Sequence, residues 1–210
     1  MAMDKQGIKT KARGLLNPIV SALAALGVPP LLISCLGLAL SIYGAVLLAG
    51  GSLFRAGILL IVAGFCDVID GALARSRNIE SRFGAFIDST FDRITEFAYF
   101  GGILLYFIDG PGGFNFLAVA SAFIALAGSV LTSYARARAE GLGLSCTVGA
   151  FERPERIALL VLGLLLGRHV LIAVLLILSV VTLFTFLQRI FHIYRLTRED
   201  AGPRGSSVSS

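Results

Sequence analysis

Residues 67–92 read DVIDGALARSRNIESRFGAFIDSTFD, and this stretch decides how the chain folds. A short polar link in its middle joins two long apolar segments, which we expect to run antiparallel as a helical hairpin. Asp67 and Asp70 are three residues apart on the first segment, and Asp88 and Asp92 are four apart on the second. Each pair therefore projects from one helix face. Counted outward from the link at equal rise per residue, Asp70 comes level with Asp88 and Asp67 with Asp92, so four carboxylates are predicted to meet at one depth.

The composition around this hairpin is that of a membrane protein. Of 210 residues, 56% are hydrophobic and 15% charged, with a mean hydropathy of +0.86 and a formal net charge of +5. A soluble domain of that composition would expose too much apolar surface. We therefore predict an all-α integral membrane protein, and we exclude disorder, collagen and disulfide scaffolds. We expect no nucleic-acid partner.

Six transmembrane helices are predicted, because a span needs roughly 20 apolar residues. The fifth is the shortest, opened by Pro154 and followed by Arg168 and His169. The predicted spans are residues 31–49, 53–74, 84–108, 114–134, 157–167 and 170–190, within one transmembrane domain at residues 29–195.

The two ends of the chain are predicted to lie outside the spans. Residues 1–28 read as a cytoplasmic N-terminus with an interfacial amphipathic helix, since apolar residues follow helical spacing behind several lysines. A cleavable signal peptide is the alternative, but Asn17 and Pro18 interrupt its apolar core. Residues 196–210 are predicted to be a disordered tail, rich in Gly, Pro and Ser.

Basic residues predict the orientation in the membrane. Of the 18 Lys and Arg, all but Arg55 and Arg168 fall toward one face of the predicted bundle. By the positive-inside rule this face is cytoplasmic. We expect a multi-pass protein of the cell membrane with both termini in the cytoplasm and the aspartates near that face.

The carboxylates predict a metal site. Asp67, Asp70, Asp88, Asp92 and Glu96 all lie in otherwise apolar helices, where like charges would repel. An all-oxygen cluster suits Mg²⁺, Mn²⁺ or Ca²⁺ rather than Zn²⁺, and four carboxylates are enough for two ions sharing ligands. The alternative is a set of helix-end salt bridges with nearby arginines, which fits four level carboxylates poorly.

The spacing of these residues resembles a known family. Written as Asp67-x2-Asp70-Gly71-x2-Ala74-Arg75-x8-Gly84-x3-Asp88-x3-Asp92, the segment carries the complete signature of the CDP-alcohol phosphotransferases. The resemblance extends over nearly the whole chain apart from its tail. It implies transfer of a substituted phosphoryl group from a CDP-linked lipid, such as CDP-diacylglycerol, to an alcohol, with CMP leaving and two divalent ions, expected to be Mg²⁺, at the site. A homodimer is also expected from the family.

The resemblance implies roles for individual residues. Asp67, Asp70 and Asp88 would hold the first metal, Asp67, Asp88 and Asp92 would share the second, and Asp92 would act as the catalytic base. At the start of the first span the chain departs from the family pattern, because Leu31 replaces a polar residue and Ser34 a threonine. The residues expected to contact the CDP-lipid are Leu31, Ser34, Asp67, Asp70, Gly71, Ala74, Arg75, Ser81 and Gly84. For Gly71 and Gly84, helix packing and substrate clearance are both open on spacing alone.

Two further stretches bear on the acceptor alcohol. SYARARAE at residues 133–140 and GAFERPER at residues 149–156 resemble the bacterial phosphatidylinositol phosphate synthases of that family, whose acceptor is L-myo-inositol 1-phosphate. The inositol phosphate contacts implied in this way are Ser133, Arg138, Arg153, Arg156 and Arg189. Arginine forks suit a phosphate monoester, although each could instead be an ordinary positive-inside residue at the lipid headgroups.

Two alternative functions stay open on the sequence. Phosphatidylglycerophosphate synthase, or another member with a different acceptor, would use the same chemistry. A cation-binding transporter would use the aspartates as an ion path, but it predicts acids spread through the membrane depth. The clustering of the acids beside a basic loop favours an enzyme.

Overall fold

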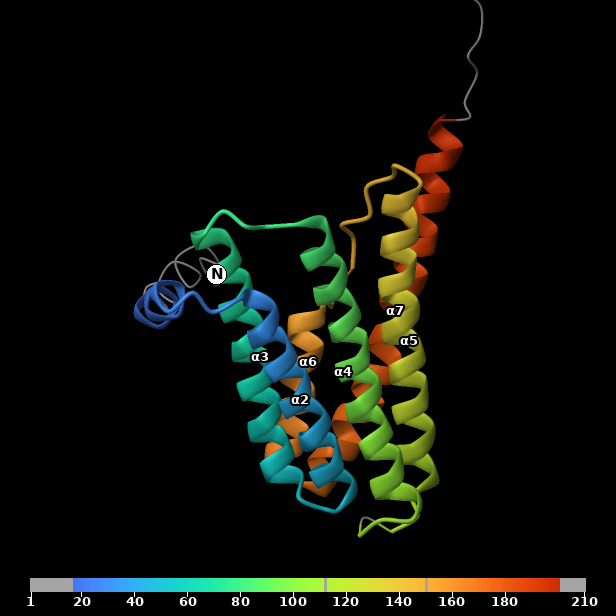
Figure 1. The fold of residues 1–210 in the computed structure, drawn as a ribbon. Coiled ribbons are helices and arrows are strands. Elements are labelled where there is room, and N and C mark those ends of the chain that lie inside the picture. Colours follow the sequence, from blue (N-terminus) through green and yellow to red (C-terminus); the bar gives the residue numbers. More distant parts are fainter. Residues whose placement is uncertain (1–16, 112, 150, 201–210) are drawn as a thin grey trace, which may run out of the picture.

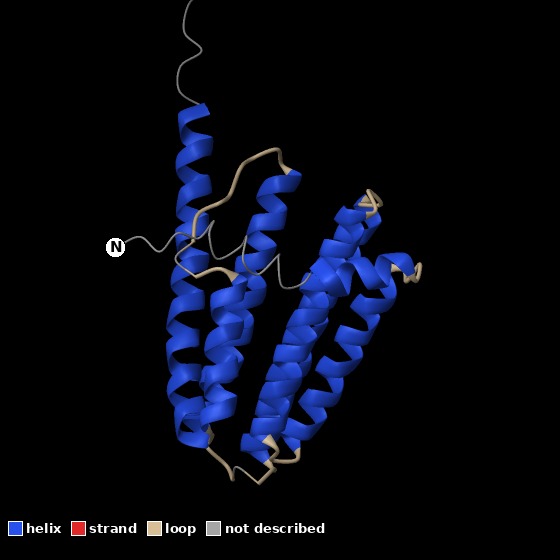
Figure 2. Cartoon of the chain, turned by 90° about the vertical axis from the view of Figure 1, so that its left-hand side faces the viewer, coloured by secondary structure: helices blue, strands red, loops and turns tan. Residues whose placement is uncertain are grey.

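The computed structural model describes residues 17–111, 113–149 and 151–200, and every regular element in these ranges is a helix (Figure 1). Residues 1–16 and 201–210 lie outside the described residues. The predictions for the first part of the N-terminal segment and for most of the tail concern these residues. The long helices are α2 (Pro30–Ala49), α3 (Leu53–Ser76), α4 (Arg82–Ile108), α5 (Phe116–Gly141), α6 (Arg153–Leu166) and α7 (Arg168–Asp200). A further helix at residues 17–25 precedes them and lies across their direction, next to the start of α2 (Figures 1 and 2).

Local signals explain where several helices begin and end. Pro30 occupies the first position of α2, where its missing N–H costs nothing. Ser81 caps α4, because its Oγ accepts a hydrogen bond from the Gly84 N–H at 2.9 Å, and Asn115 caps α5 in the same way. Between α6 and α7 the chain turns at Gly167, whose φ of +92° favours glycine.

Four of the described helices are long and apolar enough to cross a membrane: α2, α3, α5 and α7. Large apolar side chains point outward from them, as Val46, Phe65, Phe123 and Val180 do at 54–68% exposure, which is typical of a lipid-facing surface. These helices support a helical membrane protein. The other two long helices, α4 and α6, do not meet these criteria. α4 is long but carries the charged residues, and the 14 residues of α6 rise only about 21 Å against a hydrocarbon core of about 30 Å.

Two helices are longer than the apolar runs that predicted them. α5 continues from the predicted span end at residue 134 to Gly141, and α7 continues as helix to Asp200. α7 therefore includes residues 196–200, which the sequence analysis assigned to the start of the disordered tail. Charged residues end an apolar run without ending the hydrogen-bonded helix.

Packing places the functional ends of the helices together. α2 packs on α3 and α4, α6 lies against α3 and α7, and α5 lies against α4 and α7. α2 and α4 approach closely where a Cβ at Gly102 would lie only 2.6 Å from the Ala45 carbonyl oxygen. The α3–α4 and α5–α6 connections lie toward the same end of the bundle (Figure 1), so the aspartates and the arginines of the two motifs are near each other.

Candidate active site

The hairpin of α3 and α4 brings three aspartates together. One carboxylate oxygen from each of Asp67, Asp70 and Asp88 lies within 4.8 Å of the others. Asp70 is buried, and its Oδ2 accepts a hydrogen bond from the Ser34 hydroxyl of α2, whereas Asp67 and Asp88 are exposed. The site is therefore built from three helices, with α2 fixing the buried carboxylate from the side.

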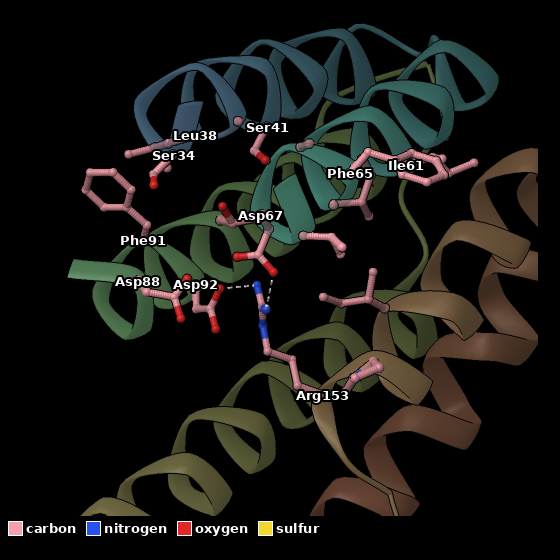
Figure 3. A pocket seen from close by; sticks show the side chains of 18 of the residues that line it. Ser34, Leu38, Ser41, Ile61, Phe65, Asp67, Asp88, Phe91, Asp92 and Arg153 are labelled. Atoms are coloured by element: carbon pink, nitrogen blue, oxygen red, sulfur yellow. Dashed lines mark ion pairs between the residues drawn. The ribbon is translucent and has the colours of Figure 1, made fainter. Parts of the chain in front are cut away.

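Asp92 lies against an arginine from α6. Its Oδ1 is 2.5 Å from Arg153 Nη2, and the other terminal nitrogen of Arg153 is 4.0 Å from Asp67 Oδ2 (Figure 3). Arg153, expected to contact the acceptor, thus reaches in among the acids in this structure. The three clustered carboxylates and the Asp92–Arg153 pair together form the acidic site.

The acidic site fits a divalent cation. The carboxylate oxygens of Asp67, Asp70 and Asp88 lie close enough together to bind one ion, and the cationic Arg153 lies against Asp67 and against Asp92 beside them. A buried carboxylate such as that of Asp70 favours a nearby positive charge. Asp67, Asp70 and Asp88 could therefore bind a metal.

A cavity of about 520 Å³ extends from the acidic site between α2, α3, α4 and α6. Its polar end holds the aspartates and Arg153, and its remaining walls are mostly apolar or small, including Leu60, Gly64, Phe65 and Val161. A Cβ at Gly64 would meet no atom of the described residues within 4 Å. The cavity therefore suits an amphiphilic ligand with an anionic head at the acids and an apolar body between α3 and α6.

The residues expected at the CDP group have identifiable neighbours. The Arg75 guanidinium lies over Gly71, where a Cβ would be 3.3 Å from Nη1. The Ser81 Oγ accepts the hydrogen bond that caps α4, and a Cβ at Gly84 would lie 3.1 Å from this oxygen. A side chain at either glycine would therefore crowd a neighbouring residue of the motif.

The remaining two positions of that group differ in exposure. Ala74 is half-buried within α3. Leu31 is 47% exposed on the first turn of α2 and does not line the cavity, in contrast to Ser34 three residues later.

The expected acceptor residues divide by burial. Arg138 is exposed at the end of α5, whereas Arg156 is 7% exposed and its Nε and Nη1 have no hydrogen-bond partner among the described residues. Arg189 is also buried, but it donates to the Val148 and Thr132 carbonyl oxygens at 3.0 and 2.7 Å. Arg189 therefore ties the loop before α6 to α5 and α7.

Ser133 takes part in a separate network. Its hydroxyl accepts a hydrogen bond from Arg93 of α4 and lies 3.1 Å from the Ser129 carbonyl oxygen, to which it donates. Arg93 also pairs with Glu96, whose carboxylate is buried. Sequence reasoning counted Glu96 among the acids in apolar helices and considered nearby arginines as salt-bridge partners, but it placed neither Glu96 nor Arg93 in the site, although Glu96 follows Asp92 by four residues and therefore shares its helix face.

Comparison with known proteins places the chain in a family. The family model for CDP-alcohol phosphatidyltransferases matches residues 27–193, which include every long helix from α2 to α6 and most of α7. The chain belongs to the CDP-alcohol phosphatidyltransferase family. It is therefore a transferase, as the aspartate motif indicates.

Several relatives of this CDP-alcohol phosphatidyltransferase are named as synthases of archaetidylinositol phosphate or phosphatidylinositol phosphate. It is 38% identical to an archaetidylinositol phosphate synthase of Methanothermobacter thermautotrophicus over 70% of this chain and 73% of the relative. It is 36% identical to a phosphatidylinositol phosphate synthase of Streptomyces avermitilis over 93% of this chain and 84% of the relative. The family assignment thus rests on relatives from both archaea and bacteria.

Solved structures agree with the fold. The phosphatidylinositol phosphate synthase of Mycobacterium tuberculosis with CDP-DAG bound superposes with a TM-score of 0.75 at 32% identity, covering 84% of this chain and 92% of that one. The same enzyme in complex with manganese and citrate gives a TM-score of 0.76 at 31% identity, covering 84% of this chain and 88% of that one. A relative of this transferase therefore binds both a CDP-linked lipid and a divalent metal.

Proposed function

We propose that this chain transfers a phosphatidyl or archaetidyl group from a CDP-linked lipid, such as CDP-diacylglycerol, to a hydroxyl of L-myo-inositol 1-phosphate. The products would be CMP and phosphatidylinositol phosphate or its archaeal counterpart. The observation that carries this proposal is the cavity that joins the acidic site to an apolar passage, with Arg153 of α6 in its wall. The names of the relatives supply the inositol phosphate.

Two divalent ions, Mg²⁺ with Mn²⁺ as a substitute, are part of the proposal. Asp67, Asp70 and Asp88 would hold one ion, and Asp67, Asp88 and Asp92 would share the other. When bound, the ions would neutralise the pyrophosphate and the leaving CMP. The all-oxygen cluster of the first three aspartates supports this assignment.

The transfer step needs a base at the acceptor hydroxyl, and we assign it to Asp92. The hydroxyl oxygen attacks the lipid-side phosphorus, the bond from that phosphorus to the CMP oxygen breaks, and Asp92 takes the hydroxyl proton. Arg153, 2.5 Å from Asp92, favours the ionised carboxylate that a base requires. Both side chains line the cavity, where a bound substrate would meet them.

The CDP group would lie at the end of α3 and the start of α4, on either side of the link between them. Gly71 and Gly84 would leave it room, Arg75 and Ser81 would contact its polar atoms, and Ala74 would contribute a small surface. Ser34 and the Leu31 backbone would complete this subsite from α2. The apolar walls between α3 and α6 would receive the lipid chains, with Gly64 keeping the passage open.

The acceptor's phosphate would bind among Ser133, Arg138, Arg153 and Arg156. Arg156 supports this most directly, because two of its donors are buried and still have no partner among the described residues. Arg189 would contribute by holding the loop that precedes α6, through its bonds to two carbonyl oxygens.

The membrane setting completes the proposal. We place the chain in the cell membrane with six spans, counting α4 and α6, and with the acidic site near the cytoplasmic face. The helix at residues 17–25 would lie at the membrane interface, and both termini would be cytoplasmic. A two-fold homodimer is the expected assembly.

An acceptor screen tests the function. Purified protein with Mg²⁺ and CDP-diacylglycerol is offered inositol 1-phosphate, glycerol phosphate, inositol or serine, and CMP release is measured. We expect release with inositol 1-phosphate and none after chelation of the metal. Release with glycerol phosphate alone would assign the phosphatidylglycerophosphate reaction instead, and release with an unphosphorylated alcohol alone would refute the phosphate site.

A further inference from the structure

Glu96 is a buried carboxylate that the transfer reaction as described does not use. It lies one turn beyond Asp92 on α4 and is 9% exposed. Its Oε1 accepts a hydrogen bond from the Ser129 hydroxyl of α5, and its Oε2 lies 2.9 Å from Arg93 Nη1. Burying a charge is costly unless the charge is paired, so this position requires specific partners.

The first partner, Arg93, stands between Glu96 and the acidic site. Its Nη1 pairs with Glu96 and donates to the Ser133 hydroxyl, while its Nη2 lies 3.9 Å from Asp92 Oδ2. The Ser133 hydrogen is directed to the Ser129 carbonyl oxygen at 3.1 Å. Ser133 therefore acts here as an acceptor that orients the Arg93 guanidinium, and Glu96 keeps that guanidinium from closing on Asp92.

The second partner is Arg156 of α6. Glu96 and Arg156 line one small cavity of about 20 Å³ together with Ser129 and Thr182. Glu96 is the opposite charge that acts most strongly on Arg156, whereas Arg93, Arg153 and Arg189 act on it as like charges. Arg93 and Arg156 thus share Glu96, whereas Arg153 is paired with Asp92, and Arg156 keeps two buried donors that have no partner among the described residues and that a phosphate could satisfy.

We propose that Glu96 is a positioning residue for the acceptor's phosphate, acting through Arg93 and Arg156. Its carboxylate holds the Arg93 guanidinium beside Asp92 and the Arg156 guanidinium at the small cavity that Glu96 and Arg156 line, so that each can face the phosphate. Without the charge, Arg93 can pair with Asp92, and Arg156 loses its counter-charge. This inference rests on the proposed function in one respect, that the acceptor carries a phosphate.

The test is the Glu96→Gln variant, which keeps the size of the side chain and an oxygen for Ser129 but removes the charge. CMP release is measured with the acceptor and the CDP-lipid varied separately. We expect the KM for the phosphorylated acceptor to rise roughly tenfold, as loss of a charged hydrogen-bond partner implies, while the KM for the CDP-lipid stays unchanged. The matched control is Glu140→Gln, which breaks an Arg136 pair of the same 2.9 Å length on the exposed surface and should leave both KM values within about twofold.

A second background tests whether the effect runs through Arg156. In an Arg156→Ala enzyme, the Glu96→Gln change should raise the acceptor KM by clearly less than in the wild type, since coupled residues are not additive. A full tenfold further rise would overturn the coupling. If Glu96→Gln is not recovered folded, Glu96→Asp serves, because it keeps the charge but withdraws it by one methylene and should raise the same KM.

Two results would overturn the positioning role. One is an unchanged acceptor KM in Glu96→Gln. The other is an equal rise in the KM for the acceptor and the KM for the CDP-lipid, which is what a general disturbance of the fold would produce. Failure of the proposed function looks different, because it appears in the wild type as CMP release with unphosphorylated alcohols alone.

Discussion

Removing the Ser34 hydroxyl should weaken metal binding without touching a metal ligand. Ser34 donates to Asp70, which is buried beside Asp67 and Asp88, so Ser34→Ala leaves a buried carboxylate without its hydroxyl donor. A hydrogen bond to a charged group contributes about 1.5–3 kcal/mol. Loss of an outer-shell partner of this kind typically costs about 10–100-fold in metal affinity. We therefore expect the Mn²⁺ affinity of Ser34→Ala to fall by roughly that factor.

The assay is titration of the purified protein with Mn²⁺, followed by the electron paramagnetic resonance signal of the free ion. The Mg²⁺ concentration for half-maximal CMP release should shift in the same direction. Ser34→Thr keeps the hydroxyl and should bind as the wild type does. Ser179→Ala is the matched control, since that buried serine of α7 donates to the Leu176 carbonyl oxygen and lies outside the cavity. A Mn²⁺ affinity of Ser34→Ala within twofold of the wild type would refute the reasoning.

Two further variants probe the two ends of the cavity. Asp92→Asn should lower kcat by at least about a hundredfold, the contribution of a general base, while binding of a CDP-lipid measured by calorimetry persists; near-normal turnover would remove Asp92 as the base. Gly64→Leu should fold with an unchanged Tm, because no atom lies near its Cβ, but should raise the KM of a long-chain CDP-lipid by roughly tenfold through overfilling of the passage. An equal effect on a short-chain CDP-lipid would contradict a role in holding the lipid chains.

The aspartate cluster could be predicted from the sequence because it depends on local geometry. The helical rise per residue is constant, and a short link forces two helices to run antiparallel, so counting along the chain brings Asp70 level with Asp88. The structure places these two together with Asp67. The helical class followed equally directly, from apolar runs that are long enough to form spans.

The contacts of Arg153 and Ser133 could not be predicted in the same way. Arg153 reaches Asp92 from α6, and Ser133 meets Arg93 across α4 and α5, at sequence separations where no periodicity links the partners. Which helix faces meet depends on close packing, such as the approach of α2 to α4 at Gly102. The cap that Ser81 forms on α4 could have been predicted, since a serine just before a helix is a local signal for a cap. The sequence analysis gave Ser81 only the CDP-binding role that the family resemblance implies.

Burial distinguishes three arginines of the proposed acceptor site. Arg138 is exposed, and its charge costs little wherever the helix ends. Arg189 is buried, but two backbone carbonyl oxygens satisfy it, so its charge is accounted for by the loop it holds. Arg156 is buried to the same degree with two donors unsatisfied by the described residues, and Glu96 lines the same small cavity. A buried cation in that state gains most from a second anion, and among these three arginines it is therefore Arg156 that should depend most on the acceptor's phosphate.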